Sequence, residues 1–498
     1  MRHYLGIDIG TFESKGVLVD AEGRIVASAA KPHKLLVPQP NWAEHRAKED
    51  WWDDFCHLSN RLIAESGVTP ADIRAVACSA IGPCMLPVDA DGVPLMHAVL
   101  YGVDARAAKE VTELTERIGE DVLVARCGNA LTSQSVGPKI LWLRRNRPEI
   151  FSRTAKILTS TTYLVHRLTS RYVIDHYSAA NFSPLYLADE QAWSTELADD
   201  IVDLEKLPEL RWTTDIAGHV TPEAAAETGL AIGTPVTPGT IDAGAEALSV
   251  GVLDAGDMLL MYGSTIFIIE LTAERVRDAR LWYAPWFFPG QHAAMSGLAT
   301  SGTLSHWFRE QFARELDPAT AVSVLAAEAE LSPPGARGLI MLPYFSGERT
   351  PIHDPDAKGV IFGLNLTHTR GDICRAMFEG IASGTRHIFE TYAEAGHEPK
   401  AVLAAGGGTK NKVWAQATSD ISGRTQIIRD KTIGASYGDA FLAALAMGDV
   451  RREDIRSWNP VASEIAPRVE NAAVYRRQYA IYRGLYERTK GLMAELST

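Results

Sequence analysis

Residues 3–20 read HYLGIDIGTFESKGVLVD, an apolar stretch that carries one aspartate, Asp8, and then turns at Gly10 and Thr11. The pattern predicts two strands joined by a tight turn, and a third strand follows over 24–30. An unpaired carboxylate inside an apolar strand is costly to bury. Asp8, Thr11 and Lys15 therefore favour a site for a phosphate group and its metal ion, with a turn-stabilising acceptor as the alternative role of Asp8.

A second aspartate occurs in an unusual setting, because residues 237–251 read TPGTIDAGAEALSVG. Gly239 and Gly244 flank Asp242, and small residues of this kind let backbone and ligand approach closely. An aspartate placed in this way is suited to accept the proton of a hydroxyl group. Asp8 and Asp242 together indicate phosphoryl transfer.

The composition sets the class of protein. The 498 residues, 46% hydrophobic and 22% charged, suggest a globular protein with two or more domains. A net charge of −13 without a basic stripe argues against a nucleic-acid partner, and no apolar run approaches the ~18 residues of a membrane span. The five cysteines contain no C-x-x-C pair, and no signal peptide is evident, so we expect reduced thiols and a cytoplasmic location.

The second half of the chain repeats the opening pattern. Residues 256–271, GDMLLMYGSTIFIIEL, again predict an apolar hairpin whose turn combines a glycine with hydroxyl residues. Helical and strand patterns alternate on either side, and no long linker separates them. The sequence therefore predicts an α/β protein of two duplicated domains, 1–248 and 249–498, with a cleft between the halves.

Three glycine-rich segments are candidate phosphate or nucleotide contacts. Gly406, Gly407 and Gly408 precede Asn411 and a predicted helix, and helix N-termini attract anions. Backbone and hydroxyl donors also occur at 263–265 and 301–303. Ordinary turns remain the alternative for each segment, since no G-x-x-x-x-G-K-[ST] motif is present. The residues selected as ATP or phosphate contacts are Thr11, Lys15, Gly263, Ser264, Gly302, Gly406, Gly407 and Asn411.

The segment 99–107 contains a candidate sugar-binding pair. Asp104 and Arg106 are able to hold a polyhydroxylated substrate through bidentate hydrogen bonds. The alternative is a helix N-cap aspartate beside a solvated arginine.

These segments together resemble the FGGY family of carbohydrate kinases, nearest the xylulokinase-like branch. The resemblance runs almost from end to end. It rests on GIDIGT at 6–11, W-x-E at 42–44, D-x-R at 104–106, PGTIDAGAEALSVG at 238–251, YGST at 262–265, SGERTPIHDPDAKGVIFGL at 346–364 and GGGTKNKVWAQATSD at 406–420.

The resemblance implies a two-lobed, actin-like and ribonuclease-H-like ATPase fold. The first lobe would hold the sugar and the second would hold ATP. By matching position, Asp242 resembles the general base of the family and Asp8 its Mg²⁺-associated aspartate, with Mg²⁺ held through water. Related kinases often form dimers, which leaves a homodimer open.

One segment departs from the family pattern. Xylulokinases carry Gln-Met-His-Gly where this chain has Ile81, Gly82, Pro83 and Cys84, so the Met-His pair that contacts the ketose is absent. Ile81 and Gly82 are taken as substrate contacts together with Asp104, Arg106 and Asp242.

The expected function is ATP-dependent phosphorylation of a sugar hydroxyl. A ketopentose such as xylulose, converted to its 5-phosphate, is the first candidate, and another pentulose, a pentitol or a polyol is the alternative. A non-catalytic nucleotide switch or a sugar sensor on the same fold is the competing class. A dinucleotide oxidoreductase is disfavoured, because no G-x-G-x-x-G follows a predicted strand.

Overall fold

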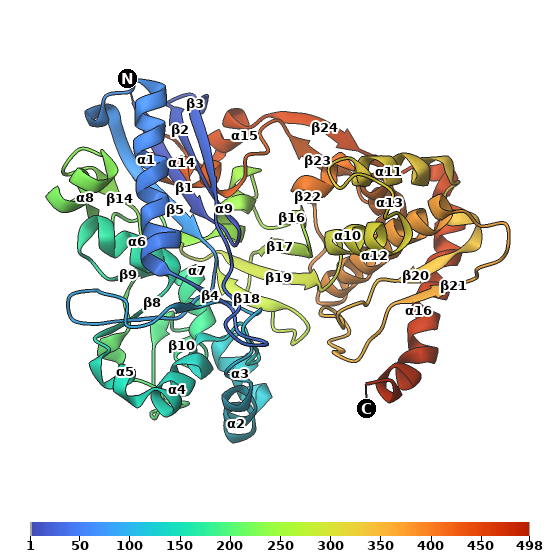
Figure 1. The fold of residues 1–498 in the computed structure, drawn as a ribbon, viewed down its shortest axis with the longest axis horizontal. Helices are drawn as coiled ribbons and strands as arrows, with labels where there is room; N and C mark the ends of the chain where they lie inside the picture. The colour runs from blue at the N-terminus through green and yellow to red at the C-terminus, as the bar shows by residue number, and fades with distance from the viewer. Residues whose placement is uncertain (1, 498) are drawn as a thin grey trace. The chain divides into compact units, whose positions relative to one another are not determined.

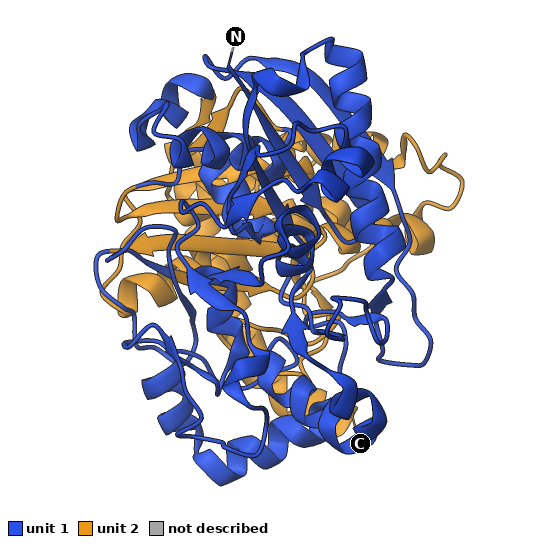
Figure 2. Cartoon of the chain, turned by 90° about the vertical axis from the view of Figure 1, so that its left-hand side faces the viewer, with its two compact units in different colours: residues 1–253, 273–293, 433–459 blue, residues 254–272, 294–432, 460–498 orange. Residues whose placement is uncertain are grey.

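A computed structural model describes residues 2–497. The chain forms two compact units, which Figure 2 colours separately. Unit 1 comprises 1–253, 273–293 and 433–459, and unit 2 comprises 254–272, 294–432 and 460–498. The boundary predicted at 248/249 lies just before the second hairpin in the sequence. The two compact units, in contrast, are each made of several separate segments of the chain.

Unit 1 is built on a mixed sheet with the strand order β13–β14–β5–β1–β2–β3, and β15 also pairs with β5. Strand β1 runs antiparallel to β2 and parallel to β5. The strands are β1 (His3–Ile9), β2 (Glu13–Asp20), β3 (Ile25–Pro32), β5 (Ile73–Ala80), β13 (Gly218–His219), β14 (Pro235–Val236) and β15 (Thr240–Ile241).

Helices cover both faces of this sheet. Gly16 of β2 meets α1, whereas Gly6 of β1 meets α14, and the alternation of side chains along paired strands places these contacts on opposite faces. The helices of unit 1 as a whole are α1 (Asp53–Ser66), α2 (Ala108–Ile118), α3 (Glu120–Cys127), α4 (Val136–Asn146), α5 (Pro148–Arg153), α6 (Ser160–Thr169), α7 (His176–Ala179), α8 (Pro222–Thr228), α9 (Asp242–Ser249), α14 (Ala435–Ala446) and α15 (Ile455–Trp458).

Unit 1 also contains short pairs of strands between residues 44 and 211, outside the main sheet. They are β4 (Glu44–His45) with β7 (Ala98–Val99), β6 (Leu86–Val88) with β8 (Lys156–Leu158), β9 (Val173–Asp175) with β12 (Glu209–Arg211), and β10 (Tyr186–Leu187) with β11 (Ala192–Trp193). The segment 273–293 contributes β18 (Trp282–Pro285).

Unit 2 repeats the central arrangement, with its strands in the order β19–β17–β16–β22–β23–β24. Its strands and helices are β16 (Asp257–Tyr262), β17 (Ile266–Thr272), β19 (His292–Leu298), β20 (Ile340–Leu342), β21 (Val360–Phe362), β22 (Ala401–Ala405), β23 (Gln426–Arg429), β24 (Val461–Ile465), α10 (Gly302–Phe312), α11 (Ala321–Leu331), α12 (Arg370–Glu394), α13 (Lys412–Ser422) and α16 (Ala472–Glu495).

The predicted internal repeat is present in the topology. The hairpin β16–β17 is antiparallel and β16 runs parallel to β22, just as the hairpin β1–β2 is antiparallel and β1 runs parallel to β5 (Figure 1). Each hairpin turns at a glycine next to a hydroxyl residue, at Gly10–Thr11 and at Gly263–Ser264. The α/β fold class predicted from the sequence is confirmed, and each unit presents one hairpin turn at the carboxyl end of its first strand.

Some predicted elements differ from the observed ones. Apolar residues at helical spacing predict a helix over 49–66, but the helical segment starts with a π-helical turn at Ala47–Trp52. The pattern from residue 101 also predicts helices, and the first of them begins only at Ala108. The apolar run GLIMLPYF at 338–345 predicts a strand, but only Ile340–Leu342 forms one, because Pro343 has no N–H group to continue the pairing. Helices α9, α11 and α14 were not anticipated by the patterns above.

Candidate active site

Three strand ends bring polar side chains together in unit 1. Asp8 near the end of β1 is the register partner of Ser79 near the end of β5, and Thr240 of β15 pairs with Ser79 from the other side. Asp242 is the first residue of α9, directly after β15. Ligands in α/β proteins bind outside the carboxyl ends of parallel strands, so Asp8, Ser79 and Asp242 occupy the expected edge of the sheet.

The carboxylates at this edge have altered acidity. Burial raises the pKa of Asp242 to about 6, while its Oδ1 accepts the backbone N–H of Ala243 at 2.7 Å. Burial, followed by the charge of Asp242, raises the pKa of Asp8 well above its usual range. The Ser79 hydroxyl, 3.1 Å from Asp8 Oδ1, opposes that shift. A carboxylate that titrates near neutral pH is suited to take up a proton during a reaction.

Glu246 is a third acidic group near this edge that the sequence reasoning missed. It lies four residues, or about one helical turn, after Asp242 on α9, and burial raises its pKa to about 7. Lys15, the register partner of Asp8 across the β1–β2 hairpin, opposes the pKa shifts of both Asp8 and Glu246. The predicted contact Lys15 therefore shares the face of the sheet that carries Asp8.

The hairpin turn of unit 1 is joined to the segment 99–107. The hydroxyl groups of Thr11 and Tyr101 lie 3.3 Å apart. Lys139 of α4 donates to the backbone oxygens of Leu100 and Tyr101, and burial lowers the pKa of Lys139 to about 8. The segment is thus fixed beside the turn at Gly10–Thr11.

Asp104 and Arg106 bond mainly to other groups of the protein, and only Nη1 of Arg106 is buried without a hydrogen-bond partner among the polar atoms of this pair in the described residues. The side chains of both are completely buried and lie 2.7 Å apart, and Arg106 also donates to Glu44 at 2.8 Å. The guanidinium group stacks on the ring of Trp42 at 3.8 Å, and Asp104 accepts the backbone N–H of Ala43. Arg106 is therefore not the solvated arginine of the alternative reading, and Asp104 does not cap α2, which begins at Ala108.

The altered segment 81–84 is packed tightly. Ile81 donates its backbone N–H to Ile9 and accepts the Ser160 hydroxyl at 2.5 Å through its carbonyl oxygen. A methyl group added to Gly82 would lie 2.7 Å from Ile241, the residue before Asp242. Substitution at Gly82 would thus disturb the start of α9.

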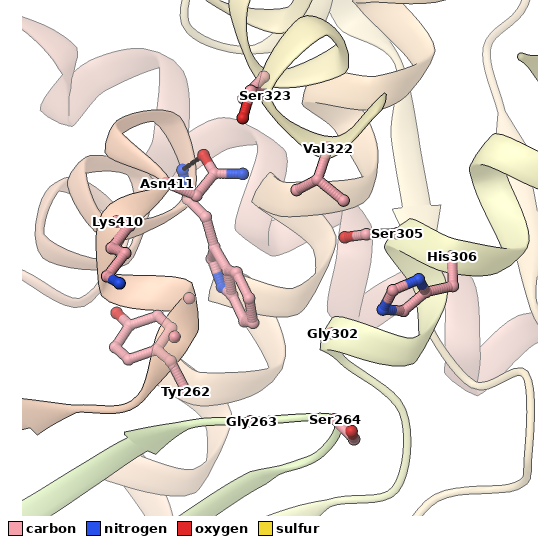
Figure 3. Close-up of a pocket in the computed structure, with 14 residues that line it drawn as sticks. Tyr262, Gly263, Ser264, Gly302, Ser305, His306, Val322, Ser323, Lys410 and Asn411 are labelled. Atoms are coloured by element: carbon pink, nitrogen blue, oxygen red, sulfur yellow. Dashed lines mark hydrogen bonds between the residues drawn. The ribbon is translucent and has the colours of Figure 1, made fainter. Parts of the chain in front are cut away.

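A cavity of about 380 Å³ lies in unit 2 between the hairpin turn of β16–β17 and the loop after β22 (Figure 3). Five of the predicted ATP or phosphate contacts line it, namely Gly263, Ser264, Gly302, Gly407 and Asn411, whereas Gly406 does not. The remaining wall consists of Tyr262, Ser305, His306, Val322, Ser323, Ala326, Gly408, Lys410 and Trp414.

The glycines in this cavity and Gly406, which lies beside it in the chain, have distinct roles. Gly302 donates its N–H to Gly263, and a methyl group on Gly302 would lie 2.4 Å from that carbonyl oxygen. Gly406 has a φ of 90°, and its added methyl group would lie 2.5 Å from the carbonyl oxygen of Tyr262. Gly407 alone has open space around the position of an added methyl group. Gly302 and Gly406 thus provide close backbone packing, and Gly407 faces free volume.

Polar groups remain available in the cavity. Asn411 caps α13 by accepting the backbone N–H of Trp414 at 3.1 Å, and Figure 3 shows its amide nitrogen on the cavity side. The indole N–H of Trp414, a lining residue, is buried without a hydrogen-bond partner in the described part of the chain. Apolar walls with a few polar groups are typical of small-molecule sites.

Three further features concern metal binding, membrane spans and the cysteines. Within residues 2–497, no three His, Cys, Asp or Glu side chains are arranged to hold a metal ion. None of the helices in this range is long and apolar enough to cross a membrane. All five cysteines, which lie in the described range, are free thiols.

Comparison with known proteins gives consistent matches over the whole chain. The N-terminal domain of the FGGY family of carbohydrate kinases matches residues 3–249, and the C-terminal domain of that family matches 258–447. A xylulose kinase of Bacillus subtilis is 29% identical over 100% of this chain and 99% of its own length. A xylulose kinase of Escherichia coli K12 is 29% identical over 99% of this chain and its own full length.

A solved structure extends the similarity to the fold. The xylulose kinase from Rhodospirillum rubrum superposes with a TM-score of 0.92 at 31% identity, covering 99% of this chain and 100% of the other. Both matched domains and both hairpin turns described above fall within that aligned length.

Proposed function

The chain belongs to the FGGY family of carbohydrate kinases, and from this premise we propose that it phosphorylates a ketopentose, xylulose first, with Asp242 as the general base. Phosphorylation of a sugar by ATP is the activity of the family. The observation that supports the base is the half-buried Asp242 at the start of α9, with its pKa raised to about 6. The names of the similar proteins support xylulose as the sugar.

The proposed reaction needs one group that accepts the proton of the sugar hydroxyl, and Asp242 of unit 1 has this role. The sugar hydroxyl oxygen attacks the γ-phosphorus of ATP, the bond to the β-phosphate oxygen breaks, and ADP leaves. The hydroxyl proton passes to the carboxylate of Asp242. Positioning and charge neutralisation supply most of the rate enhancement in phosphoryl transfer, and a general base contributes about 10²–10⁴-fold.

The nucleotide belongs, in this proposal, in the cavity of unit 2. Its walls offer the open backbone at Gly407 and the amide of Asn411 as hydrogen-bonding groups beside apolar side chains. Ser264 and Gly263 lie in the hairpin turn, where backbone groups suit a phosphate. Thr11 and Lys15 occupy the equivalent hairpin of unit 1 and are proposed to contact the transferred phosphoryl group.

The residues near Asp8 fit a magnesium ion held mostly by water and phosphate. One carboxylate is enough for Mg²⁺, which usually keeps several waters, and Asp8 has one oxygen bonded to Ser79 and a second oxygen on the same carboxylate. Mg²⁺ would neutralise phosphate oxygens when bound. Asp8 would orient the waters of the ion, and Lys15 would limit the repulsion among the acidic groups.

The residues on the sugar side determine which substrate is bound. The segment Ile81–Cys84 replaces the Met-His pair of xylulokinases, so another pentulose, a pentitol or a polyol is the alternative substrate. In this proposal Ile81 and Gly82 affect the shape of the sugar pocket through Ile241. The buried Asp104 and Arg106 affect the pocket indirectly, through the segment of the chain that contains Tyr101. A cytoplasmic location is part of the proposal, and a homodimer stays open as one form of assembly.

The testing experiment measures ADP release from Mg²⁺-ATP with a panel of ketoses, aldoses and polyols, using Asp242→Asn as the blank. Strong turnover with xylulose that disappears in the variant supports the proposal. Turnover only with another pentulose or a pentitol would move the assignment to that sugar. An absence of turnover with every sugar, although ATP binds, would contradict the substrate class.

A further inference from the structure

One residue, His33, makes two hydrogen bonds to the hairpin turn of unit 1. It directly follows β3, and its backbone N–H donates to the carbonyl oxygen of Phe12 at 2.9 Å. Its side chain reaches the other side of the turn, where Nε2 lies 3.0 Å from the carbonyl oxygen of Gly10. A carbonyl oxygen only accepts, so Nε2 donates in this bond. The carbonyl groups on either side of Thr11 are therefore both held by His33.

The turn needs such support, because its tip is open to solvent. Phe12 is 62% exposed, and Thr11 is half-buried. Within the turn, the backbone N–H of Gly10 donates to Glu13 at 3.1 Å. A short turn with little buried surface opens easily unless another group holds it. The two bonds from His33 hold this turn closed against the end of β3.

The ring of His33 is oriented by a buried acid. Asp54 lies in the first turn of α1, and its Oδ2 is 2.9 Å from Nδ1 of His33. The side chains of His33 and Asp54 are only 5% and 1% exposed, so solvent competes little for this contact. The hydrogen bond at one ring nitrogen sets the direction of the other nitrogen. Asp54 thus keeps Nε2 directed at Gly10.

Asp54 is in turn held by the two strands beside it. Ser14 of β2 donates to its Oδ2 at 2.7 Å, and Lys31 Nζ of β3 lies 2.6 Å from its Oδ1. Ser14 and Lys31 are register partners, so their side chains leave the sheet on the same face. The charge of Lys31 compensates the buried carboxylate, which would be costly to bury alone. The position of Asp54 is therefore fixed by α1, β2 and β3 together.

Packing also restricts rotation of the His33 ring. The ring of His45 meets it edge to face, with 5.0 Å between the centroids. His45 is completely buried and is fixed by Trp51, whose Nε1 donates to Nδ1 of His45 at 3.1 Å. The hairpin turn thus rests on side chains that have little freedom to move.

We propose that His33 and Asp54 are positioning residues that hold the turn at Gly10–Thr11 in the shape needed for phosphoryl transfer. Asp54 acts through the ring of His33, and the ring acts through the carbonyl oxygen of Gly10. Neither side chain touches a substrate in this proposal. The inference rests on the proposed function, in which Thr11 contacts the transferred phosphoryl group. A displacement of about 1 Å at such a contact can cost about 10²-fold in rate.

The test compares two substitutions of His33 that each keep one half of its hydrogen bonding. In His33→Gln the amide nitrogen takes the place of Nε2 and donates to Gly10. In His33→Asn the shorter amide reaches Asp54 but not Gly10. We expect kcat to fall about 10- to 100-fold in His33→Asn and to stay within about fivefold of the native value in His33→Gln, with little change in the KM for the sugar. Equal losses of kcat in the two variants would overturn the proposal.

A double-mutant cycle tests whether Asp54 acts through His33. Asp54→Asn keeps the size of the side chain but removes the charge that orients the ring, so kcat should fall about 3- to 10-fold. In the His33→Asn background the bond to Gly10 is already lost, so Asp54→Asn should cause no further loss. Additive losses would contradict action through His33. His166→Asn is the matched control and should leave kcat unchanged, because the ring of His166 stacks on Tyr172 at 4.2 Å.

Hydrogen exchange separates this inference from the proposed function, because it needs no sugar. The amide of Gly10 should exchange faster in His33→Asn than in the native protein or in His33→Gln, as mass spectrometry of peptides spanning the turn would report. Unchanged exchange in His33→Asn would show that His33 does not hold the turn. Faster exchange with native turnover would show that the turn's shape does not limit the reaction. Exchange in the expected order without turnover of any sugar would support the hold on the turn and contradict only the proposed substrate class.

Discussion

Asp242 is the residue on which proton removal depends in the proposed reaction. Asp242→Asn keeps the size and the hydrogen bond from Ala243 but removes the basic carboxylate. We expect kcat to fall by about 10²–10⁴-fold, the usual contribution of a general base, while ADP affinity stays near the native value. Steady-state turnover and calorimetry on the same preparation check this. Near-native turnover in the variant would remove Asp242 from the base role.

The raised pKa of Asp242 predicts a pH dependence. With a pKa of about 6, the base is mostly protonated below pH 6, so kcat/KM should fall about tenfold per pH unit on the acid side. The stability of the folded protein changes with pH in the opposite direction to kcat/KM. Because burial raises the pKa of Asp242 in the folded protein above its ordinary value of 3.8, ionisation between about pH 4 and 6 lowers the free energy of unfolding.

Two measurements check that dependence. A pH–rate profile should show the acid limb near pH 6 in the native protein, and the residual activity of Asp242→Asn should lack it. Urea unfolding of the same pair at pH 4.5 and 7 should show a larger decline of stability with pH in the native protein. A native profile that is flat down to pH 5 would contradict the raised pKa.

Single residues differ in how far the sequence reveals them. Asp8 and Asp242 are visible because an acid beside glycines interrupts an apolar run. Ser79 and Glu246 are not, because strand register and the turn of a helix make them neighbours of these acids. The W-x-E and D-x-R motifs were recognisable, but only the structure reveals that Arg106 is completely buried against Trp42 and Glu44.

At the scale of elements, the hairpins were predictable and α14 was not. In the hairpin sequences, apolar residues alternate with polar ones or form continuous apolar runs between glycine-containing turns. Both patterns predict strands. Helix α14 reads ASYGDAFLAALA, and it is buried over Ala435–Ala444, so it lacks the polar face that gives a surface helix its periodicity. Gly438 further weakens its helical signal.

The close contact of α14 with α9 gives a prediction for that element. In Gly438→Ala the added methyl group meets the carbonyl oxygen of Ala245, so α14 and α9 must separate. We expect a lower melting temperature and a loss of kcat, since α9 carries Asp242. Gly484→Ala in α16 is the matched control, because open space surrounds that position and alanine favours a helix.

Thermal unfolding and turnover of both variants make the comparison. Gly484→Ala should melt at or above the native temperature with native turnover. A Gly438→Ala protein with native stability and turnover would show that the two helices tolerate a wider spacing.

At the scale of the whole chain, unit 1 is assembled from segments far apart in the sequence. Residues 433–459 supply α14 and α15, which cover the face of β1 that carries Tyr4, Gly6 and Asp8. The Tyr437 hydroxyl donates to the carbonyl oxygen of Gly23 at 2.7 Å within this region. The boundary predicted at 248/249 was placed where the sequence pattern repeats. Such a boundary does not reveal that a helix from much later in the chain, α14, packs on the sheet of unit 1.

This interleaving predicts how fragments behave. A fragment of residues 1–253 lacks α14, so the apolar and acidic face of β1 would be exposed, and we expect it to be insoluble or to unfold without a cooperative transition. The same fragment joined to 433–459 through a flexible glycine-serine linker should gain solubility and a cooperative urea transition, because the linker costs little compared with the buried face that it restores. Circular dichroism during urea titration compares the two. If 1–253 alone unfolded as cooperatively as the linked fragment, the late segment would be an addition to unit 1 and not part of its core.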